Sequence, residues 1–265
     1  MYKKLGFSSL AFYEAPLENA LIWGEDSKFN LLEIVAENNH AIDEETMPKV
    51  KDILSSYSFE YTVHSPFSDI NISSLNKSIR KVSIQQVKYA IYAVNEIGGK
   101  VMTFHPGRHS AATNRDKELT KKILFDSLKE ISTYNEDYGV VIALENMPDT
   151  FVTTMKVSQE ILEVLENKQL PGIKHTMDVG HLETNNVDIE RYIQDLKDFL
   201  VHIHLHDNLG EFDNHLPLGE GNIDFSKVFM ALKKINYSGR MILEMTNTED
   251  ILKSREFLRE RKYLI

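Results

Sequence analysis

The segment VVIALE at residues 140–145 is the clearest copy of a unit that recurs through the chain. It is a short apolar run containing β-branched residues, which predicts a buried strand, and it ends in a carboxylate. The preceding segment, 117–134, repeats apolar residues at the spacing of an amphipathic helix, and Gly139 separates the two. A helix that returns the chain to a buried strand is the unit of an α/β fold.

The strand-like pattern occurs eight times, with no linker or low-complexity tract between the copies. The runs cover residues 4–9, 30–37, 59–64, 100–105, 140–145, 173–178, 200–206 and 240–245. Segments of helical period lie between them, among them 79–97, 117–134, 158–167, 189–199 and 225–235. This alternation predicts a single (β/α)8 TIM barrel over residues 1–265. A doubly wound open sheet is the alternative, because the same alternation builds it.

Composition excludes several classes of protein. The 265 residues include 30 Lys and Arg against 40 Asp and Glu, a net charge of −10, and 42% are hydrophobic, which argues for a globular core and against disorder, collagen and coiled coil. The absence of cysteine excludes disulfides, thiolate catalysis and thiolate metal sites. Without an apolar run of ~18 residues or a secretion signal, we expect a cytoplasmic protein with no membrane partner. The net acidity makes duplex DNA an unexpected partner.

Metal-competent side chains stand at the ends of six consecutive predicted strands. In a barrel the carboxyl-terminal strand ends form the mouth that holds the active site. The six side chains, in chain order, are His64, His105, Glu145, Asp178, His204 and Glu244, and His181 follows Asp178 by three residues. The period of two along a strand turns Glu145 inward with Ala143 and leaves Leu144 to pack on the helices. The same alternation turns His175 outward, so we expect it to be a structural residue.

A single side chain of this kind is more often a hydrogen-bonded structural group than a metal ligand. Six of them at one barrel mouth are more readily explained as ligands. Burying several carboxylates and imidazoles together without a cation costs, by desolvation, on the order of several kcal/mol for each group. A donor set of His, Asp and Glu suits Zn or Mn, with Co and Fe as alternatives. Asp213 and His215, in the long loop 208–222, are two more candidate ligands, giving one to three ions. Gly219 and Gly221 in that loop either shape a turn or offer backbone amides to a substrate phosphate.

A set of short motifs, in order along the chain, resembles the xylose-isomerase-like TIM-barrel superfamily. The motifs are HSPFSDIN (64–71), FHPG (104–107), LEN (144–146), DVGH (178–181), HIHLHDN (202–208), DNHLPLGEGNID (213–224) and ILEM (242–245). The superfamily includes sugar and sugar-phosphate isomerases and epimerases, inosose dehydratase and endonuclease IV. The resemblance implies a barrel with a divalent metal at its mouth.

The resemblance also implies ligand sets. The single-metal epimerases imply Glu145, Asp178, His204 and Glu244 as ligands, and the three-zinc site of endonuclease IV implies these four with five more, which are His64, His105, His181, Asp213 and His215. The chain departs from endonuclease IV in its opening segment, LGFSSLAFYE, and at Phe67, where a tyrosine is usual. It departs from the ketose 3-epimerases at Gly210, where a substrate-binding arginine is expected, which argues against that particular chemistry.

From these observations we expect a divalent-metal-dependent sugar or sugar-phosphate isomerase or epimerase that works through a metal-bound enediolate. Glu145 and Glu244 are expected to move the proton beside the carbonyl, as general base and acid, with His181 as a third catalytic residue. His64, Arg108 and the amides of Gly219 and Gly221 are expected to bind a small polyhydroxy or phosphorylated substrate. The alternatives are a zinc phosphodiesterase that repairs abasic DNA and a non-catalytic metal-binding barrel.

Overall fold

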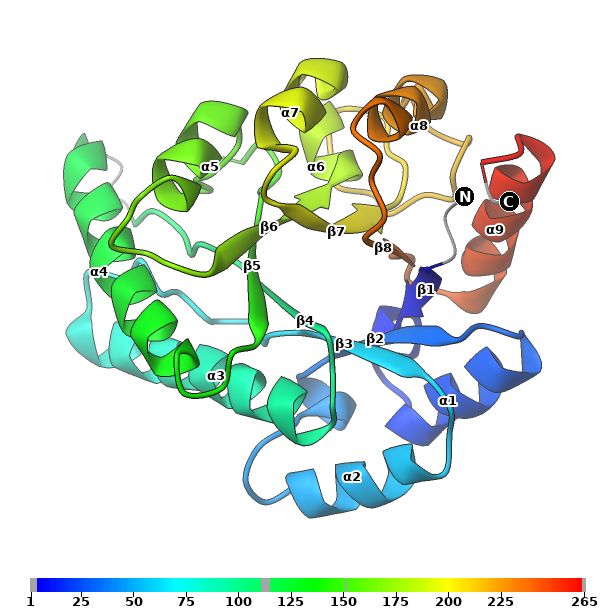
Figure 1. Ribbon diagram of the computed structural model, residues 1–265, viewed down its shortest axis with the longest axis horizontal. Helices are drawn as coiled ribbons and strands as arrows, with labels where there is room; N and C mark the ends of the chain where they lie inside the picture. Colours follow the sequence, from blue (N-terminus) through cyan, green and yellow to red (C-terminus); the bar gives the residue numbers. More distant parts are fainter. Residues whose placement is uncertain (1–3, 111–114, 151, 264–265) are drawn as a thin grey trace.

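Eight parallel strands form a closed barrel in the computed structural model, which describes residues 4–110, 115–150 and 152–263 (Figure 1). The strands are β1 (Leu5–Ser8), β2 (Leu31–Val35), β3 (Glu60–His64), β4 (Val101–Phe104), β5 (Val141–Glu145), β6 (Ile173–Asp178), β7 (Leu200–Leu205) and β8 (Arg240–Leu243). Each strand pairs with its neighbours in sequence, and β1 also pairs with β8, with Gly6 opposite Ile242. This closure confirms the TIM barrel and rules out the open sheet.

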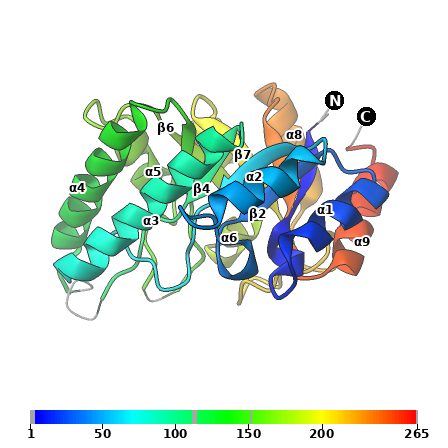
Figure 2. The ribbon, with the colours of Figure 1, turned by 90° about the horizontal axis from the view of Figure 1, so that it is seen from below.

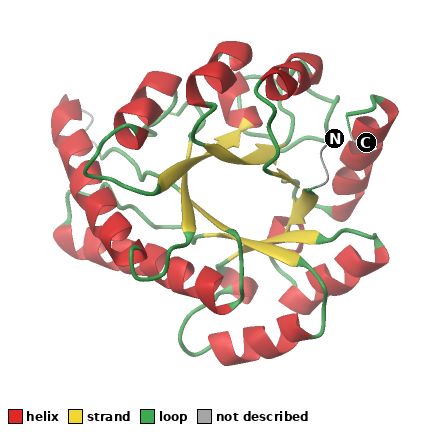
Figure 3. Cartoon of the chain, in the orientation of Figure 1, coloured by secondary structure: helices red, strands yellow, loops and turns green. Residues whose placement is uncertain are grey.

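Helices surround the strands as an outer ring (Figure 3). They are α1 (Leu17–Asp26), α2 (Met47–Ser55), α3 (Lys77–Glu96), α4 (Lys117–Asn135), α5 (Ser158–Leu165), α6 (Val179–Thr184), α7 (Ile189–Leu196), α8 (Phe225–Lys234) and α9 (Thr248–Glu260), and two short 3-10 helices cover Ser9–Phe12 and Asn38–His40. Strict one-to-one alternation is wrong at one place, since both α6 and α7 lie between β6 and β7. All the strands except β6 are also shorter than expected, and His105, His206 and Glu244 fall just beyond the ends of β4, β7 and β8.

The main core lies between the outer face of the sheet and the helices. Ile142 and Leu144 of β5 are fully buried members of this core, as the alternation along the strand predicts. The interior of the barrel is more polar: the hydroxyls of Thr103 and Thr176 lie 2.8 Å apart within it, and both residues are fully buried. The apolar stabilisation therefore comes from the helix layer, and the barrel interior is free to hold polar groups that are paired with one another.

The loops beyond the carboxyl ends of the strands gather with α6 at one end of the barrel (Figure 2). The long loop between β7 and α8 is folded around the carboxylate of Asp207, which accepts hydrogen bonds from the backbone amides of Gly219, Gly221 and Ile223 at 2.9–3.2 Å. A pair of backbone hydrogen bonds between Asp207 and Leu216 closes the same loop. This brings residues 213–215 back over the mouth. No helix among the described residues is long and apolar enough to cross a bilayer.

Candidate active site

Four side chains from four strands meet at the centre of the mouth. The Nδ1 atom of His204 lies 3.0 Å from Oε1 of Glu145, 3.2 Å from Oε2 of Glu244 and 3.8 Å from Oδ2 of Asp178. One donor atom from each of the four residues lies within 4.8 Å of all the others. All four side chains are buried, with Glu244 the most exposed at 8%. Three carboxylates and one imidazole thus converge on a single point.

The barrel register explains why these four residues meet. Asp178 on β6 is the direct partner of His204 on β7, so both stand at the same height in the barrel. Glu145 is the last residue of β5, and Glu244 follows β8 with its amide bonded to the carbonyl of Leu205. Asp178 also caps the N-terminus of α6, since its carboxylate accepts a hydrogen bond of 2.7 Å from the amide of His181. Strand-end position and inward parity together predict this convergence.

His64 and His105 lie on one side of this centre. The Nε2 atoms of both imidazoles are 3.1 Å from Oε2 of Glu145, while Nδ1 of His64 donates to the carbonyl of Ser65. The ring of Phe67 covers the pair, with centroids 5.4 Å from His64 and 5.5 Å from His105. Glu145 is therefore shared between the central group and a second group of three donors, His64–His105–Glu145.

A third group of donors lies on the other side, around Asp213. Its Oδ2 atom is 3.0 Å from Nε2 of His181 and 3.3 Å from Nε2 of His215. Nε2 of His206 lies 3.0 Å from Oδ1 of Asp178 and 3.5 Å from Oδ1 of Asp213, and the His206 ring stacks on that of His215 at 4.0 Å. The structure thus brings together all nine residues that the sequence marks as candidate ligands, in three adjoining groups.

Opposite charges balance one another in this mouth. Burial raises the pKa of Glu145, but the imidazoles of His204, His105 and His64 outweigh it and hold that pKa well below its ordinary range. Burial lowers the pKa of His204, and the carboxylates of Glu244, Glu33 and Glu145 raise it to a net value well above the ordinary range. Each of these two charged forms is therefore stabilised by neighbours of opposite charge.

Burial and charged neighbours also oppose each other in their effects on the pKa values of His64, His215 and Glu244. Burial works against the charged form of His64, but Glu145 raises its pKa to about 9. Burial opposes the charged form of His215 as well, while Asp213 and Glu244 raise its pKa to about 9. For Glu244 burial raises the pKa, and His204 and His215 bring it down to about 2. A divalent cation is the other partner that could balance such a set of carboxylates.

The donor chemistry fits a divalent cation of the Zn or Mn type. Two glutamates, one aspartate and one imidazole form a mixed oxygen and nitrogen set with no thiolate. Two buried polar atoms near the mouth also have no hydrogen-bond partner among the described residues, Oδ1 of Asp213 and Nδ1 of His206. Buried polar atoms are normally satisfied, so unpaired atoms in this place favour a ligand.

Three residues expected to bind substrate are placed differently. The amides of Gly219 and Gly221 already donate to Oδ2 of Asp207, so they shape the loop and are not free to hold a phosphate. This corrects the expectation for both glycines. Arg108 has an exposed side chain, and among the described residues its interactions are those of its backbone, with Asn71 and Thr153. Its guanidinium is not part of the buried groups.

Glu33, His202 and His206 are site residues that strand-end reasoning missed. Glu33 and His202 are fully buried within β2 and β7, below the mouth, and His206 lies one residue beyond β7. A signal for Glu33 exists in the sequence, since it is an inward-facing charge between Leu32 and Ile34 in an otherwise apolar strand. The period of two along HIHLHDN places His202 and His206 on the same face as His204, but only His204 was predicted as a ligand.

Comparisons with known proteins agree with this barrel. The profile of the xylose isomerase-like TIM-barrel family matches residues 21–261. L-ribulose-5-phosphate 3-epimerase of Escherichia coli is 22% identical over 198 residues, which is 72% of this chain and 67% of that protein. The crystal structure of a D-tagatose 3-epimerase-like protein is 32% identical, with a TM-score of 0.89 over 97% of this chain and 96% of that one.

A more distant structure carries a metal. The crystal structure of the IolI protein, with a bound zinc atom, superposes with a TM-score of 0.82 over 98% of this chain and 99% of that one. The two sequences are 19% identical, so this likeness concerns the fold. A protein with the same fold therefore carries a bound zinc atom.

Proposed function

The chain belongs to the xylose isomerase-like TIM-barrel family, and from that premise we propose that it is a divalent-metal-dependent sugar isomerase or epimerase. The observation that carries the proposal is the convergence of Glu145, Asp178, His204 and Glu244 within 4.8 Å of one another. Relatives named as 3-epimerases of ketoses and ketose phosphates support this reaction class. A small polyhydroxy substrate and a cytoplasmic location are parts of the same proposal.

In this proposal the four central residues hold the cation. Bound there, a divalent metal acts as a Lewis acid that polarises a carbonyl and makes the neighbouring C–H bond more acidic. Glu145 and Glu244 stand on β5 and just after β8, on either side of His204, with contacts of 3.0 and 3.2 Å to its Nδ1. One carboxylate takes the proton from the carbon beside the carbonyl, and the other returns a proton to the resulting enediolate.

Substrate orientation falls to the flanking groups. His181 and His64 stand on opposite sides of the central group and are held by Asp213 and Glu145 respectively. Their second ring nitrogens are bonded to the backbone carbonyls of Asn146 and Ser65, so in this proposal a sugar hydroxyl would replace Asp213 or Glu145 as the partner of Nε2. Because Asp207 occupies the amides of Gly219 and Gly221, no phosphate contact is assigned to that loop, and a non-phosphorylated ketose is the better fit. Gly210 offers no side chain for the arginine contact expected in ketose 3-epimerases.

Exchange with solvent tests the proposed reaction directly. The protein is loaded with Mn or Zn and incubated in D2O with a panel of ketoses and of three- and five-carbon ketose phosphates. NMR then follows the formation of epimers and the incorporation of deuterium at carbon. We expect metal-dependent deuterium incorporation beside the carbonyl of at least one ketose, abolished by chelation. A protein that binds metal but exchanges no C–H proton in any of these compounds would contradict the enzymatic proposal and leave the metal-binding barrel.

Zinc phosphodiesterase activity is the second candidate, favoured by one observation. The His64–His105–Glu145 group and the His206–Asp213–His215 group adjoin the central one, as a multinuclear site for displacement at phosphorus requires. The net charge of −10 argues against a duplex substrate. Elemental analysis separates the two candidates: one ion per chain favours epimerisation, whereas three ions with metal-dependent incision of an oligonucleotide at an abasic site would favour phosphodiester hydrolysis.

A further inference from the structure

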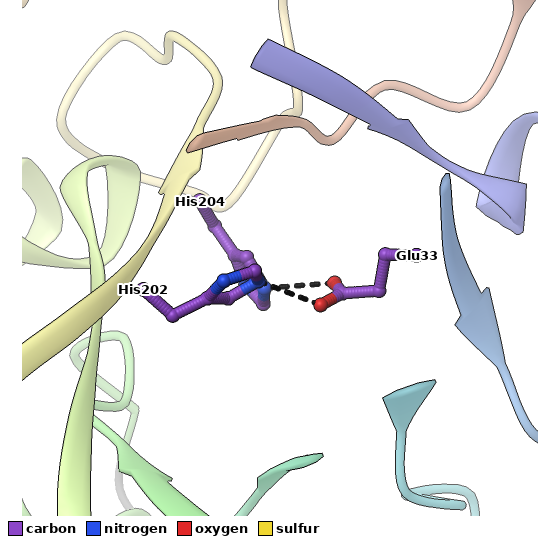
Figure 4. A group of neighbouring side chains, drawn as sticks. All are labelled: Glu33, His202 and His204. Carbon is purple, nitrogen blue, oxygen red and sulfur yellow. Dashed lines mark hydrogen bonds and ion pairs between the residues drawn. The ribbon is translucent and has the colours of Figure 1, made fainter. Parts of the chain in front are cut away.

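Beneath the mouth, Glu33 of β2 reaches across the barrel interior to His202 and His204 of β7 (Figure 4). Dashed lines in that view join its carboxylate oxygens to ring nitrogens of both histidines. Nε2 of His202 lies 2.7 Å from Oε2 of Glu33, and Nε2 of His204 lies 2.9 Å from Oε1. All three side chains are fully buried. None of them belongs to the reaction steps above except His204, through its other ring nitrogen.

The two oxygens of Glu33 are in different situations. Oε2 accepts hydrogen bonds from Oγ1 of Thr62, at 3.1 Å, and from Nε2 of His202. Oε1 has no aligned hydrogen bond among the described residues, and neither does Nε2 of His204, although the two atoms are 2.9 Å apart. Each of these buried atoms therefore has the other as its natural partner, and leaving both unpaired would cost free energy.

The two nitrogens of His204 face opposite environments. Nδ1 faces the carboxylates of Glu145 and Glu244, while Nε2 faces Glu33. A carboxylate can only accept a hydrogen bond, so the carboxylates favour an N–H at both nitrogens. A cation held by Glu145 and Glu244 would displace the proton from Nδ1, and Glu33 would keep the proton on Nε2. A ligating histidine commonly donates its second ring N–H to a carboxylate in this way, which fixes the tautomer and the ring orientation.

We propose that Glu33 is a positioning residue, which holds the Nε2–H of His204 and thereby presents Nδ1 to the cation. This inference rests on the proposed function, because it assigns Nδ1 of His204 as the ligand atom in that site. It also explains the charge buried directly beneath the central group: a carboxylate enclosed in a barrel is costly unless positive charge lies near it, and a cation at Nδ1 of His204 would supply that charge through the imidazole. His202 and Thr62 hold the other oxygen of Glu33 in place.

The test compares two variants that alter different oxygens of the same arrangement. Glu33→Gln keeps the size of the side chain but removes the carboxylate that faces His204, and Thr62→Val removes a hydrogen bond to Oε2 while leaving Oε1 and His204 unchanged. Cobalt affinity is measured by competition with a chelator for the wild type and both variants, after circular dichroism of the metal-free proteins. We expect Glu33→Gln to weaken binding about 10–100-fold and Thr62→Val less than about threefold.

A second readout uses the wild type and does not depend on the folding of any variant. In the cobalt-loaded protein with ¹⁵N-labelled histidine, NMR reports which nitrogen of His204 carries a proton. We expect a shifted, slowly exchanging N–H on Nε2, and in folded Glu33→Gln a faster exchange of that proton. Coordination of cobalt through Nε2, or a folded Glu33→Gln protein that binds cobalt as tightly as the wild type, would overturn the role of Glu33. A wild-type protein that binds no cation would overturn the proposed function as well.

Discussion

His175 and His204 lie on neighbouring strands and are both fully buried, yet their surroundings are opposite in kind. His175 faces the helices: Nδ1 donates to the carbonyl of Leu144, and Nε2 accepts from the hydroxyl of Tyr192, at 2.8 and 3.0 Å. His204 faces the barrel axis, with the carboxylates of Glu145 and Glu244 at one ring nitrogen and that of Glu33 at the other. One imidazole is satisfied by neutral groups, and the other is surrounded by charge.

The pKa values express this difference. Burial lowers the pKa of His175 to about 4, with its hydrogen bond to Leu144 opposing the change, so the ring stays neutral. For His204 the same burial is outweighed by carboxylates, and the pKa lies well above the ordinary range. Burial alone therefore does not separate a structural histidine from one in a candidate site. The charge of the partners does, and three predictions test that distinction.

The largest effect, a loss of turnover, is expected at the carboxylates that surround His204. Glu145→Gln and Glu244→Gln each remove a proton-transferring carboxylate with little change in size, so turnover in the exchange assay should fall about 10²–10⁴-fold. Metal affinity should fall as well, since both are candidate ligands. Glu220→Gln, at an exposed position of the loop after β7, serves as the control and should retain activity. Wild-type turnover in both site variants would contradict their assignment as acid and base.

A smaller, pH-dependent effect is expected at His175. Its pKa is about 4 in the folded protein and 6.5 in a free chain, so the unfolded state takes up a proton first as the pH falls. The stability conferred by the neutral ring is complete above pH 6.5 and is lost between pH 6.5 and 4, by about 3.5 kcal/mol at about 1.4 kcal/mol per pKa unit. Urea unfolding of the wild type and His175→Gln over this range measures it. Equal pH slopes for the two proteins would show that His175 is not the group responsible.

The smallest effect is expected at Tyr192. Tyr192→Phe removes the hydroxyl that donates to Nε2 of His175 and leaves a buried acceptor without a partner, which costs about 1–2 kcal/mol. Equilibrium unfolding at pH 7.5 measures the change, and Tyr89→Phe, at a half-buried tyrosine of α3, should cost less than about 0.5 kcal/mol. Metal affinity should be unchanged in both variants. A loss of metal binding in Tyr192→Phe would mean that the helix layer and the mouth are coupled.

The alternation of strand and helix patterns predicted eight βα units, because both periods are local properties of the backbone, but it left an open sheet as the alternative to the barrel that the pairing of β1 with β8 closes. The inward parity of Glu145, the outward parity of His175 and the strand-end positions of Asp178 and His204 follow from the same period of two. Local patterns place strand ends within a residue or two, but the short helix α6, which follows Asp178 directly, was not among the predicted helices.

Contacts between distant segments needed the closed barrel. Glu33 and His202 are 169 residues apart in the chain and meet because closure sets β2 and β7 across one interior. Asp207 accepts hydrogen bonds from the amides of Gly219 and Gly221 because the long loop folds back on its own start. These amides, which were candidate donors to a substrate phosphate, therefore stabilise the loop. Residue type and local period establish which groups face the mouth. Which atom of each group meets which partner depends on strand register and loop closure, and these arise only when the whole chain packs.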